Sequence, residues 1–221
     1  MARARSSLNW RFERRMRPAA EIVVAGVDEV GRGCWAGPVF AAAAILPDGL
    51  THRHLKDSKQ ILPGNREELS VFLCAHAEVR WAIGIASVEE IDSHNILQAS
   101  LLAMRRAVAG LSLAPHFCLI DGNQKAGLPC DERTIVDGDA LCPSIAAASV
   151  IAKVARDRAM AEFAVLYPAY GLEKHKGYGT PYHARALALY GPCPIHRKSF
   201  RPVREQASSA AGDEGRNREL W

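Results

Sequence analysis

The sequence predicts an α/β protein with a mixed β-sheet whose first strands are antiparallel. Short apolar segments suited to buried strands come first along the chain, and helical segments then alternate with further short strands. The content of 48% hydrophobic and 24% charged residues is typical of a globular protein. No run approaches the ~20 apolar residues that cross a membrane, so we expect no membrane association.

Five segments are predicted as strands: 21–27, 37–46, 78–87, 116–121 and 133–137. The first, EIVVAGV, is short and almost wholly apolar, as buried strands are. The second opens with Gly-Pro, which disfavours a helix start, and in the third apolar residues alternate along the chain.

Four segments are predicted as helices: 65–77, 93–111, 143–166 and 181–190. Asn65 can cap the first, and the second has one apolar side and stops at Gly110. The third is rich in alanine, and its small side chains allow close packing against a sheet.

The composition divides the chain into a core region and two tails. Residues 1–20 hold six arginines and one acid, which predicts a disordered basic tail that can hold nucleic acid loosely. Residues 205–221 are polar and are also predicted to be disordered. The folded domain is therefore expected to span residues 21–204.

Six scattered cysteines without a C-x-x-C pair favour reduced thiols, and no secretory signal is recognised. We therefore expect a cytoplasmic protein. The net charge of +4 permits a polyanionic partner without requiring one.

Acidic residues follow three of the predicted strands. They are Asp28-Glu29, Asp121, and the pair Asp137 and Asp139. Functional sites of α/β folds gather at strand ends, and carboxylates that converge there repel each other. A hard divalent cation such as Mg²⁺ relieves that repulsion, and two ions ~4 Å apart can serve a phosphodiester displacement.

Two observations complicate a metal site. The Asp-Gly pairs at 121–122 and 137–138 suit ordinary turns, although a turn does not require a second acid beside Asp28. Successive strand residues also point to opposite faces, so Asp28 and Glu29 cannot both face one site on a regular strand. We therefore expect an irregular backbone there, which Gly31 and Gly33 would permit.

The glycine-rich segment that follows has two interpretations. GRGCWA, residues 31–36, matches a dinucleotide-binding pattern, which requires a helix to begin there. The following residues instead resemble a strand. The other interpretation is exposed backbone that can approach a sugar closely.

An ordered set of motifs resembles the bacterial type 2 ribonucleases H, the ribonuclease HII family. The resemblance covers residues 22–203 and rests on GVDEVGRG, AGPV, DSK, LIDGN, AAASVIAKVARD and HKGYGT. It implies a ribonuclease-H-like mixed sheet flanked by helices, with a C-terminal helical extension. It also implies hydrolysis of RNA in RNA/DNA hybrids and at single ribonucleotides within duplex DNA, with two Mg²⁺ or Mn²⁺ ions, leaving 3′-hydroxyl and 5′-phosphate ends.

The resemblance also assigns site residues. The metal-binding and catalytic carboxylates correspond to Asp28, Glu29, Asp121 and Asp139. The loop that senses the 2′-OH corresponds to Gly31, Arg32 and Gly33, and the tyrosine that stacks on the next sugar to Tyr178. The phosphate contacts correspond to Lys59, Asn95, Ser149 and Lys153.

Some positions keep two interpretations. Ser149 and Lys153 share a helical face that could hold a phosphate, yet Lys153 could equally pair with Asp157. The residues alone do not choose Asp139 over Asp137, which would share a face if they lay on a strand. The resemblance selects Asp139.

His175, His183 and His196 lack metal-ligand spacing and are expected at the surface. We expect a monomer acting on ribonucleotide-containing duplexes. The alternative from another class is a non-catalytic nucleic-acid-binding module with the same fold.

Overall fold

The computed structural model describes residues 8–19, 21–55 and 61–207. The chain divides into two units. Unit 1 comprises Met1–Val30, Phe40–Ile85 and Ser100–Ala155, and unit 2 comprises Gly31–Val39, Ala86–Ala99 and Arg156–Trp221.

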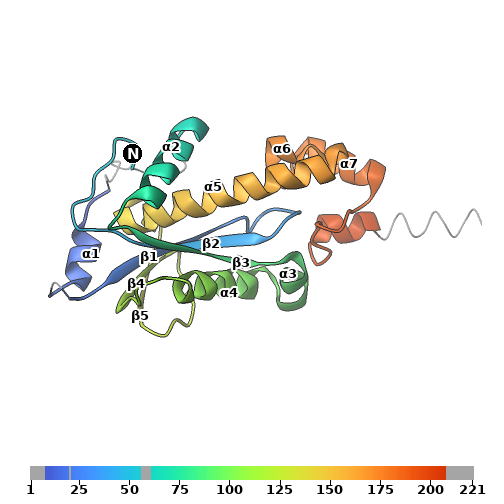
Figure 1. Cartoon of the computed structure of the whole chain (residues 1–221). Helices are drawn as coiled ribbons and strands as arrows, with labels where there is room; N and C mark the ends of the chain where they lie inside the picture. The colour runs from blue at the N-terminus through green and yellow to red at the C-terminus, as the bar shows by residue number, and fades with distance from the viewer. Residues whose placement is uncertain (1–7, 20, 56–60, 208–221) are drawn as a thin grey trace, which may run out of the picture. The chain divides into compact units, whose positions relative to one another are not determined.

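The named elements follow one another along the chain as drawn in Figure 1: α1 Arg11–Met16, β1 Val24–Val30, β2 Val39–Ile45, α2 Pro63–Ala75, β3 Arg80–Ala86, α3 Val88–His94, α4 Ile96–Ala109, β4 Phe117–Asp121, β5 Asp131–Ile135, η2 Gly138–Ala140, α5 Pro143–Leu166, η3 Pro168–Tyr170, α6 Leu172–His175 and α7 Pro181–Tyr190. The predicted bounds of the helices at 143–166 and 181–190 are confirmed.

The sheet has five strands in the order β3-β2-β1-β4-β5. β1 pairs with β2 in the antiparallel sense and with β4 in the parallel sense, and β4 and β5 are also parallel. This confirms an α/β fold with a mixed sheet and antiparallel first strands. β1 is central, so its carboxyl end lies beside that of β4.

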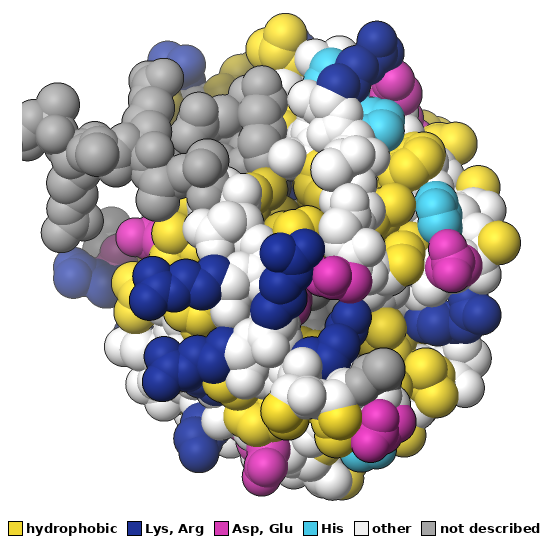
Figure 2. All heavy atoms as spheres, turned by 90° about the vertical axis from the view of Figure 1, so that its left-hand side faces the viewer, with side chains coloured by type: hydrophobic (Ala, Val, Ile, Leu, Met, Phe, Trp, Pro, Cys, Tyr) yellow, Lys and Arg dark blue, Asp and Glu magenta, His cyan; other side chains and the backbone are white. Residues whose placement is uncertain are grey.

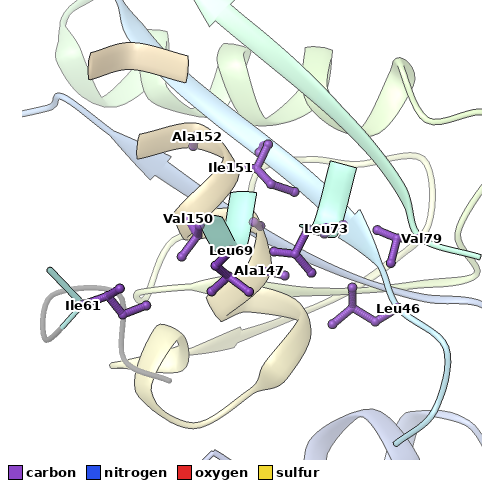
Figure 3. Packing of buried hydrophobic residues seen from close by; sticks show 12 residues of the cluster. Leu46, Ile61, Leu69, Leu73, Val79, Ala147, Val150, Ile151 and Ala152 are labelled. Atoms are coloured by element: carbon purple, nitrogen blue, oxygen red, sulfur yellow. The ribbon is translucent and has the colours of Figure 1, made fainter. Parts of the chain in front are cut away.

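Helices cover both faces of the sheet in unit 1. α2 and α5 lie on one face and α4 on the other (Figure 1). Figure 3 shows the core on the α2 and α5 side, where Leu69 and Leu73 of α2 meet Val150 and Ile151 of α5 beside Leu46. Burial of these side chains removes apolar surface from water, which holds both helices on the sheet.

The sheet and helices approach closely where glycine replaces a side chain. A Cβ on Gly26 of β1 would lie 2.1 Å from the backbone carbon of Ser144 in α5. A Cβ on Gly84 of β3 would lie 2.0 Å from the carbonyl oxygen of Ala103 in α4. The small residues of α5 continue this close packing, as its alanine-rich sequence predicts.

Helix α1 lies within the segment expected to be a disordered tail. Phe12 and Met16 pack against Val24 and other buried residues of unit 1. Glu13 is buried, and its Oε1 accepts hydrogen bonds from the backbone N–H (3.0 Å) and hydroxyl (2.8 Å) of Ser144. The expectation of disorder is therefore wrong for Arg11–Met16, whereas residues 1–7 lie outside the described residues.

Helix α1 packs near the first residues of β1. α1 packs on Val24 and Phe117, the first residues of β1 and β4, whereas Asp28 lies four residues further on, roughly 13 Å away. Figure 2 views the molecule from the side where α1 lies, and Lys and Arg side chains are spread over that face. Arg14 there pairs with Asp48 at 3.1 Å.

Two helix details differ from the sequence prediction. α2 begins at Pro63, so Asn65 lies inside the helix and does not cap it. The helix expected at 93–111 is α4, Ile96–Ala109, and the first two expected residues instead end α3, because Asn95 adopts φ 70° between the two helices. Ser87 caps α3 through a capping box with Glu90.

Unit 2 has its own apolar core. Met160 of α5 packs with Tyr170, Leu172 and Ala186, and Ile195 joins them from the segment after α7. Helices α6 and α7 form the expected C-terminal helical extension. Among the described helices, none is long and apolar enough to cross a membrane.

Candidate active site

Asp28 and Glu29 lie on a regular part of β1. Asp28 pairs with Ala42 and Glu29 with Ala41 in an unbroken antiparallel register that continues through Val30. The expected irregular backbone at the two acids is therefore wrong. The left-handed conformation begins only at Gly31, with φ 98°.

The two acids interact although they point to opposite faces of the strand. Asp28 Oδ1 accepts a hydrogen bond from the backbone N–H of Glu29 at 2.7 Å. The side chain of Asp28 is buried, with 6% exposed, whereas Glu29 is half-buried. Asp28 is thus the inner group of the pair.

Asp28 is also the electrostatic centre of the acidic group in unit 1. Burial raises the pKa of Asp28 well above its usual value, and repulsion from Glu29, Asp121 and Asp139 raises it further. A hydrogen bond from the Ser149 side chain acts in the opposite direction. All four carboxylates selected from the sequence therefore belong to one interacting cluster.

Asp121 and Asp139 are connected through the turn after β5. Asp121 ends β4, and its Oδ1 accepts from the backbone N–H of Gly138 at 2.7 Å and from that of Asp139 at 3.4 Å. Asp139 lies in the 3₁₀ helix η2 with 2% of its surface exposed. Asp137 before it is left-handed, with φ 55°, and exposed. Neither residue lies on a strand, since β5 ends at Ile135, so Asp137 and Asp139 do not share a strand face.

The carboxylate cluster suits a hard divalent cation by its chemistry. The four carboxyl groups, three of which raise the pKa of buried Asp28, provide oxygen ligands and a negative charge that a cation would neutralise. Within the described residues, no three Asp, Glu, His or Cys side chains are already arranged as a metal site. The donor set therefore fits the cation, and its side chains require adjustment to close around one.

Helix α5 brings a hydroxyl to the same cluster. Ser149 is buried and bonds the Asp28 carboxylate, so the structure gives it a carboxylate contact that the sequence did not predict. Lys153 follows one turn later on α5 and is half-buried. Lys59, the other lysine expected to grip phosphate, lies outside the described residues.

The glycine loop belongs to unit 2 and begins no helix. Residues Gly31 to Pro38 lead directly into strand β2, which rules out the dinucleotide interpretation because that requires a helix start. Cys34 forms an isolated bridge with Tyr178, and the N–H of Trp35 donates to the carbonyl of Gly177 at 2.8 Å. The loop and the Tyr178 segment are thus joined by backbone contacts.

Two fully buried arginines hold this loop, and neither was predicted to matter. Arg156 donates to the carbonyl oxygens of Pro38, Ala36 and Lys176 at 3.0–3.1 Å. Arg197 donates to those of Gly37 at 2.8 Å and Arg32 at 3.0 Å. A Cβ on Gly31 would lie 2.2 Å from Arg156 Nε, so this glycine makes room for the guanidinium. The sequence carries no clear signal for this role, because Asp157 and Arg158 follow Arg156, and Arg197 stands between His196 and Lys198.

Tyr178 and Asn95 take different roles in unit 2. The Tyr178 side chain is 42% exposed, and burial of its remaining surface raises its pKa, so the hydroxyl stays protonated at neutral pH.

Asn95 Oδ1 accepts from the N–H groups of Leu97 (3.0 Å) and Gln98 (3.1 Å) and therefore caps α4. Asn95 also lines a pocket of about 440 Å³ with Asp92, Ser93, His94, Ile96, Ser199 and Phe200.

The histidines expected at the surface are mostly internal. His183 and His196 are fully buried, and their Nε2 atoms lie 3.0 Å apart. His175 is half-buried and stacks on His183 with ring centroids 4.5 Å apart. The expectation of surface positions is wrong for His183 and His196, because the chain after α7 folds back over α7.

Comparison with known proteins gives a consistent result. A family model described as Ribonuclease HII matches residues 25–203. A Ribonuclease HII of Bordetella pertussis is 51% identical over 182 residues, covering 82% of this chain and 90% of that protein. One of Parvibaculum lavamentivorans is 52% identical over 201 residues, covering 90% of this chain and 74% of that protein.

The fold is also similar to a solved structure. The crystal structure of ribonuclease H2 from Pyrococcus horikoshii matches with a TM-score of 0.72 and 27% sequence identity. The match covers 85% of this chain and 98% of that one. The similarity therefore includes almost the whole of the archaeal protein, in agreement with the ribonuclease-H-like fold expected from the motifs.

Proposed function

Because this chain belongs to the ribonuclease HII family, we propose that it nicks DNA duplexes on the 5′ side of single embedded ribonucleotides. The coarser activity follows from the family itself. The chain is a metal-dependent endoribonuclease, a hydrolase that cleaves the RNA strand of RNA/DNA hybrids. The proposal adds the single-ribonucleotide substrate and the residues that carry out the reaction.

The observation that carries the proposal is the raised pKa of Asp28, caused by burial and by three neighbouring carboxylates. A buried acidic cluster costs folding free energy, and it is typical of functional sites. In the proposed site, Asp28, Asp121 and Asp139 would hold two Mg²⁺ or Mn²⁺ ions, and half-buried Glu29 would join them by turning its side chain around the end of β1. Such ions lower the pKa of a bound water and neutralise charge on a phosphate.

The protein's own groups orient this site. Asp28 is the buried member of the group that would hold the ions, and Ser149 would orient its carboxylate by donating to it. The backbone N–H of Gly138 holds one oxygen of Asp121. In the reaction, a water oxygen loses a proton and bonds to phosphorus, the bond from phosphorus to the 3′ oxygen breaks, and that oxygen takes up a proton, which leaves 3′-hydroxyl and 5′-phosphate ends.

The recognition residues are proposed in unit 2. Gly31, Arg32 and Gly33 present backbone to the 2′-OH, which distinguishes RNA from DNA. The exposed ring of Tyr178 stacks on the following sugar, and a bridge to Cys34 keeps its segment on the loop. Lys59, Asn95, Ser149 and Lys153 remain predicted phosphate contacts, with capping by Asn95 and the Ser149–Asp28 bond as their additional roles.

The experiment uses three labelled duplexes: one with a single ribonucleotide, an RNA/DNA hybrid, and an all-DNA control. We expect one nick 5′ to the ribonucleotide with Mg²⁺ or Mn²⁺, cleavage of the hybrid, and none of the all-DNA duplex. Absence of the nick from protein that is folded by circular dichroism contradicts the proposal. A non-catalytic binding module would bind all three duplexes and cut none. The monomeric state and the cytoplasmic location remain predictions, which sedimentation and fractionation test.

A further inference from the structure

Two buried histidines in unit 2 are linked to the backbone of Tyr178. Nδ1 of His183 lies 3.0 Å from the Tyr178 carbonyl oxygen, and its Nε2 lies 3.0 Å from Nε2 of His196. On the far side, Nδ1 of His196 lies 3.0 Å from the backbone nitrogen of Cys193 and 3.1 Å from its Sγ. The contacts form one continuous chain from Cys193 to Tyr178.

The chemistry of each group fixes the direction of every hydrogen bond. A carbonyl oxygen only accepts, so the Nδ1 of His183 must carry the proton that it shares with Tyr178. A neutral imidazole has one N–H, so the Nε2 of His183 accepts and the Nε2 of His196 donates. Nδ1 of His196 then accepts from Cys193, whose backbone N–H donates. Burial raises the pKa of the Cys193 thiol, so its S–H is retained and can also donate.

An added proton breaks this chain. If His183 were an imidazolium, its Nε2–H would face the Nε2–H of His196 across 3.0 Å. If His196 were an imidazolium, its Nδ1–H would face the backbone N–H of Cys193 across 3.0 Å. Burial lowers the pKa of His183, and burial together with repulsion from His183 lowers the pKa of His196 to about 4. Both rings are therefore neutral at physiological pH, as the directions of the bonds require.

The surroundings hold the rings in place. His175 stacks on His183, donates from Nε2 to the Tyr170 carbonyl at 2.8 Å and accepts at Nδ1 from the N–H of Gly177. The Trp35 ring packs on His183 with centroids 5.5 Å apart, and the Tyr170 ring lies 4.8 Å from His196. The other titratable groups at the pair are thus His175, Tyr170, Tyr178 and Cys193, with Arg197 next in the chain.

We propose that His183 and His196 are positioning residues for Tyr178, acting as a directional hydrogen-bond chain that fixes the tyrosine's carbonyl and so the aim of its ring. The inference rests on the proposed function, since Tyr178 is there the residue that stacks on the sugar. The Tyr178 carbonyl also accepts from the backbone N–H of Thr180 at 2.9 Å. Two apolar side chains would fill the same space as the histidines, but they would leave the carbonyl with the Thr180 donor and without the one from His183. Misplacement of a positioning group by about 1 Å can cost roughly a hundredfold in rate.

The first test is spectroscopic and needs no activity. Long-range ¹H–¹⁵N correlation spectra of the ¹⁵N-histidine-labelled full chain at about pH 7.5 report which ring nitrogen is protonated. We expect His183 protonated at Nδ1, which is the minor form of free imidazole, and His196 protonated at Nε2. A charged ring, or His183 protonated at Nε2, overturns the inference.

The second test uses the variant His183→Phe. Phenylalanine keeps a ring at this position but removes the hydrogen bonds to the Tyr178 carbonyl and to His196. The ¹³C shift of the Tyr178 carbonyl should move, and kcat/KM for the single-ribonucleotide duplex should fall about tenfold. In His183→Asn the side-chain amide nitrogen is bonded to Cγ, as Nδ1 is in histidine, so it can still donate to the Tyr178 carbonyl. This variant should therefore recover most of the lost kcat/KM. An unmoved carbonyl shift, or no recovery in His183→Asn, overturns the inference.

A double-mutant cycle separates positioning from general stability. If His183 acts through Tyr178, His183→Phe should change kcat/KM by less than about twofold in a Tyr178→Ala background. An equal fold-change in both backgrounds overturns the inference. Tyr170→Phe is the matched control, because it removes another hydrogen bond of unit 2, from the hydroxyl to the Gly191 carbonyl at 2.8 Å, without touching Tyr178.

Failure of the proposed function gives a different pattern. The wild type could fail to nick and still show the expected histidine tautomers, with a moved Tyr178 carbonyl shift in His183→Phe. That result would support the hydrogen-bond chain and contradict only the proposed substrate. A protein that nicks but has the wrong tautomers refutes the positioning role alone.

Discussion

Asp28 combines burial with three neighbours of the same charge. Its pKa is raised, so its ionised form destabilises the folded chain in the absence of a cation. A raised folded-state pKa contributes stability that is present below the unfolded value of 3.8 and is lost as the pH rises through the folded value. At neutral pH the ionised Asp28 carboxylate therefore lowers the free energy of unfolding. Its proposed role in metal binding explains why an acid occupies this position.

Asp28→Asn should remove activity and stabilise the metal-free protein. The amide keeps the shape of the carboxyl group and can still accept from Ser149, while the buried charge disappears. We expect nicking to fall a hundredfold or more, within the order known for loss of one transition-state contact. In EDTA the variant should melt at a higher temperature than wild type, because the buried charge that raises the pKa of Asp28 is gone.

Mg²⁺ provides the control for this prediction. A cation bound to the native state stabilises wild type more than Asp28→Asn, so the difference in melting temperature should shrink as Mg²⁺ is added. Equal responses of the two proteins to Mg²⁺ would show that Asp28 is no ligand.

At the scale of elements, the approach of β1 to α5 depends on Gly26. The missing Cβ allows the strand to lie against the backbone at Ser144, and the same helix carries Ser149 to Asp28. Packing of the two elements and the shape of the acidic cluster are therefore linked.

Gly26→Ala should destabilise unit 1. The added Cβ would lie 2.1 Å from a backbone atom, which cannot rotate away, so α5 must shift. We expect a loss of about 2–3 kcal/mol by urea unfolding, as for overpacked cores, together with reduced nicking. Gly64→Ala in α2 is the control, because its Cβ meets nothing within 4 Å and should be neutral or stabilising.

Helix α1 is attached to unit 1 by Glu13 at the start of α5. Burial is the largest cause of the raised pKa of Glu13, and the two bonds from Ser144 offset part of that rise. The carboxylate also lies at the positive end of the α5 dipole, which favours an acidic group. Residues 11–16 are therefore part of the folded domain. The arginine-rich composition predicted a tail because composition does not show that Glu13 is buried.

Glu13→Ala should cost about 1–3 kcal/mol, because the N–H and hydroxyl of Ser144 lose their acceptor in the interior. Glu13→Gln keeps an acceptor oxygen and removes the buried charge, so it should cost less. Chemical denaturation of both variants measures the difference. If Glu13→Ala unfolds like wild type, α1 does not stabilise unit 1.

At the scale of the whole molecule, the buried pair His183 and His196 should control how the free energy of unfolding falls as the pH is lowered. The pKa of His196 is lowered from 6.5 to about 4, so the unfolded chain binds more protons than the folded chain between these values. The stability is present above pH 6.5 and is lost as the pH falls toward 4.

Between pH 6.5 and about 4, protonation of His196 alone should lower the free energy of unfolding of the wild type by up to about 3 kcal/mol. The slope of stability against pH should be shallower in His196→Gln, which has no titrating ring. Glu13 and Asp28 titrate in both proteins, so their effects cancel in the comparison. Equal slopes would contradict the lowered pKa.

The sequence by itself determined the α/β class, the bounds of α5 and α7, and the family through its ordered motifs. Apolar periodicity, Gly-Pro boundaries and alanine content act over a few neighbouring residues, so they can be read along the chain. The same local patterns placed acids at strand ends, whereas the choice of Asp139 over Asp137 came from the family resemblance.

Only the tertiary structure decided which polar groups are buried and what they contact. Asp139 is buried and Asp137 exposed because a 3₁₀ turn follows β5, and His183 meets His196 across 13 residues of chain. Arg197 reaches the carbonyl of Gly37 across 160 residues. Such contacts depend on segments far apart in the sequence, and no local pattern encodes them.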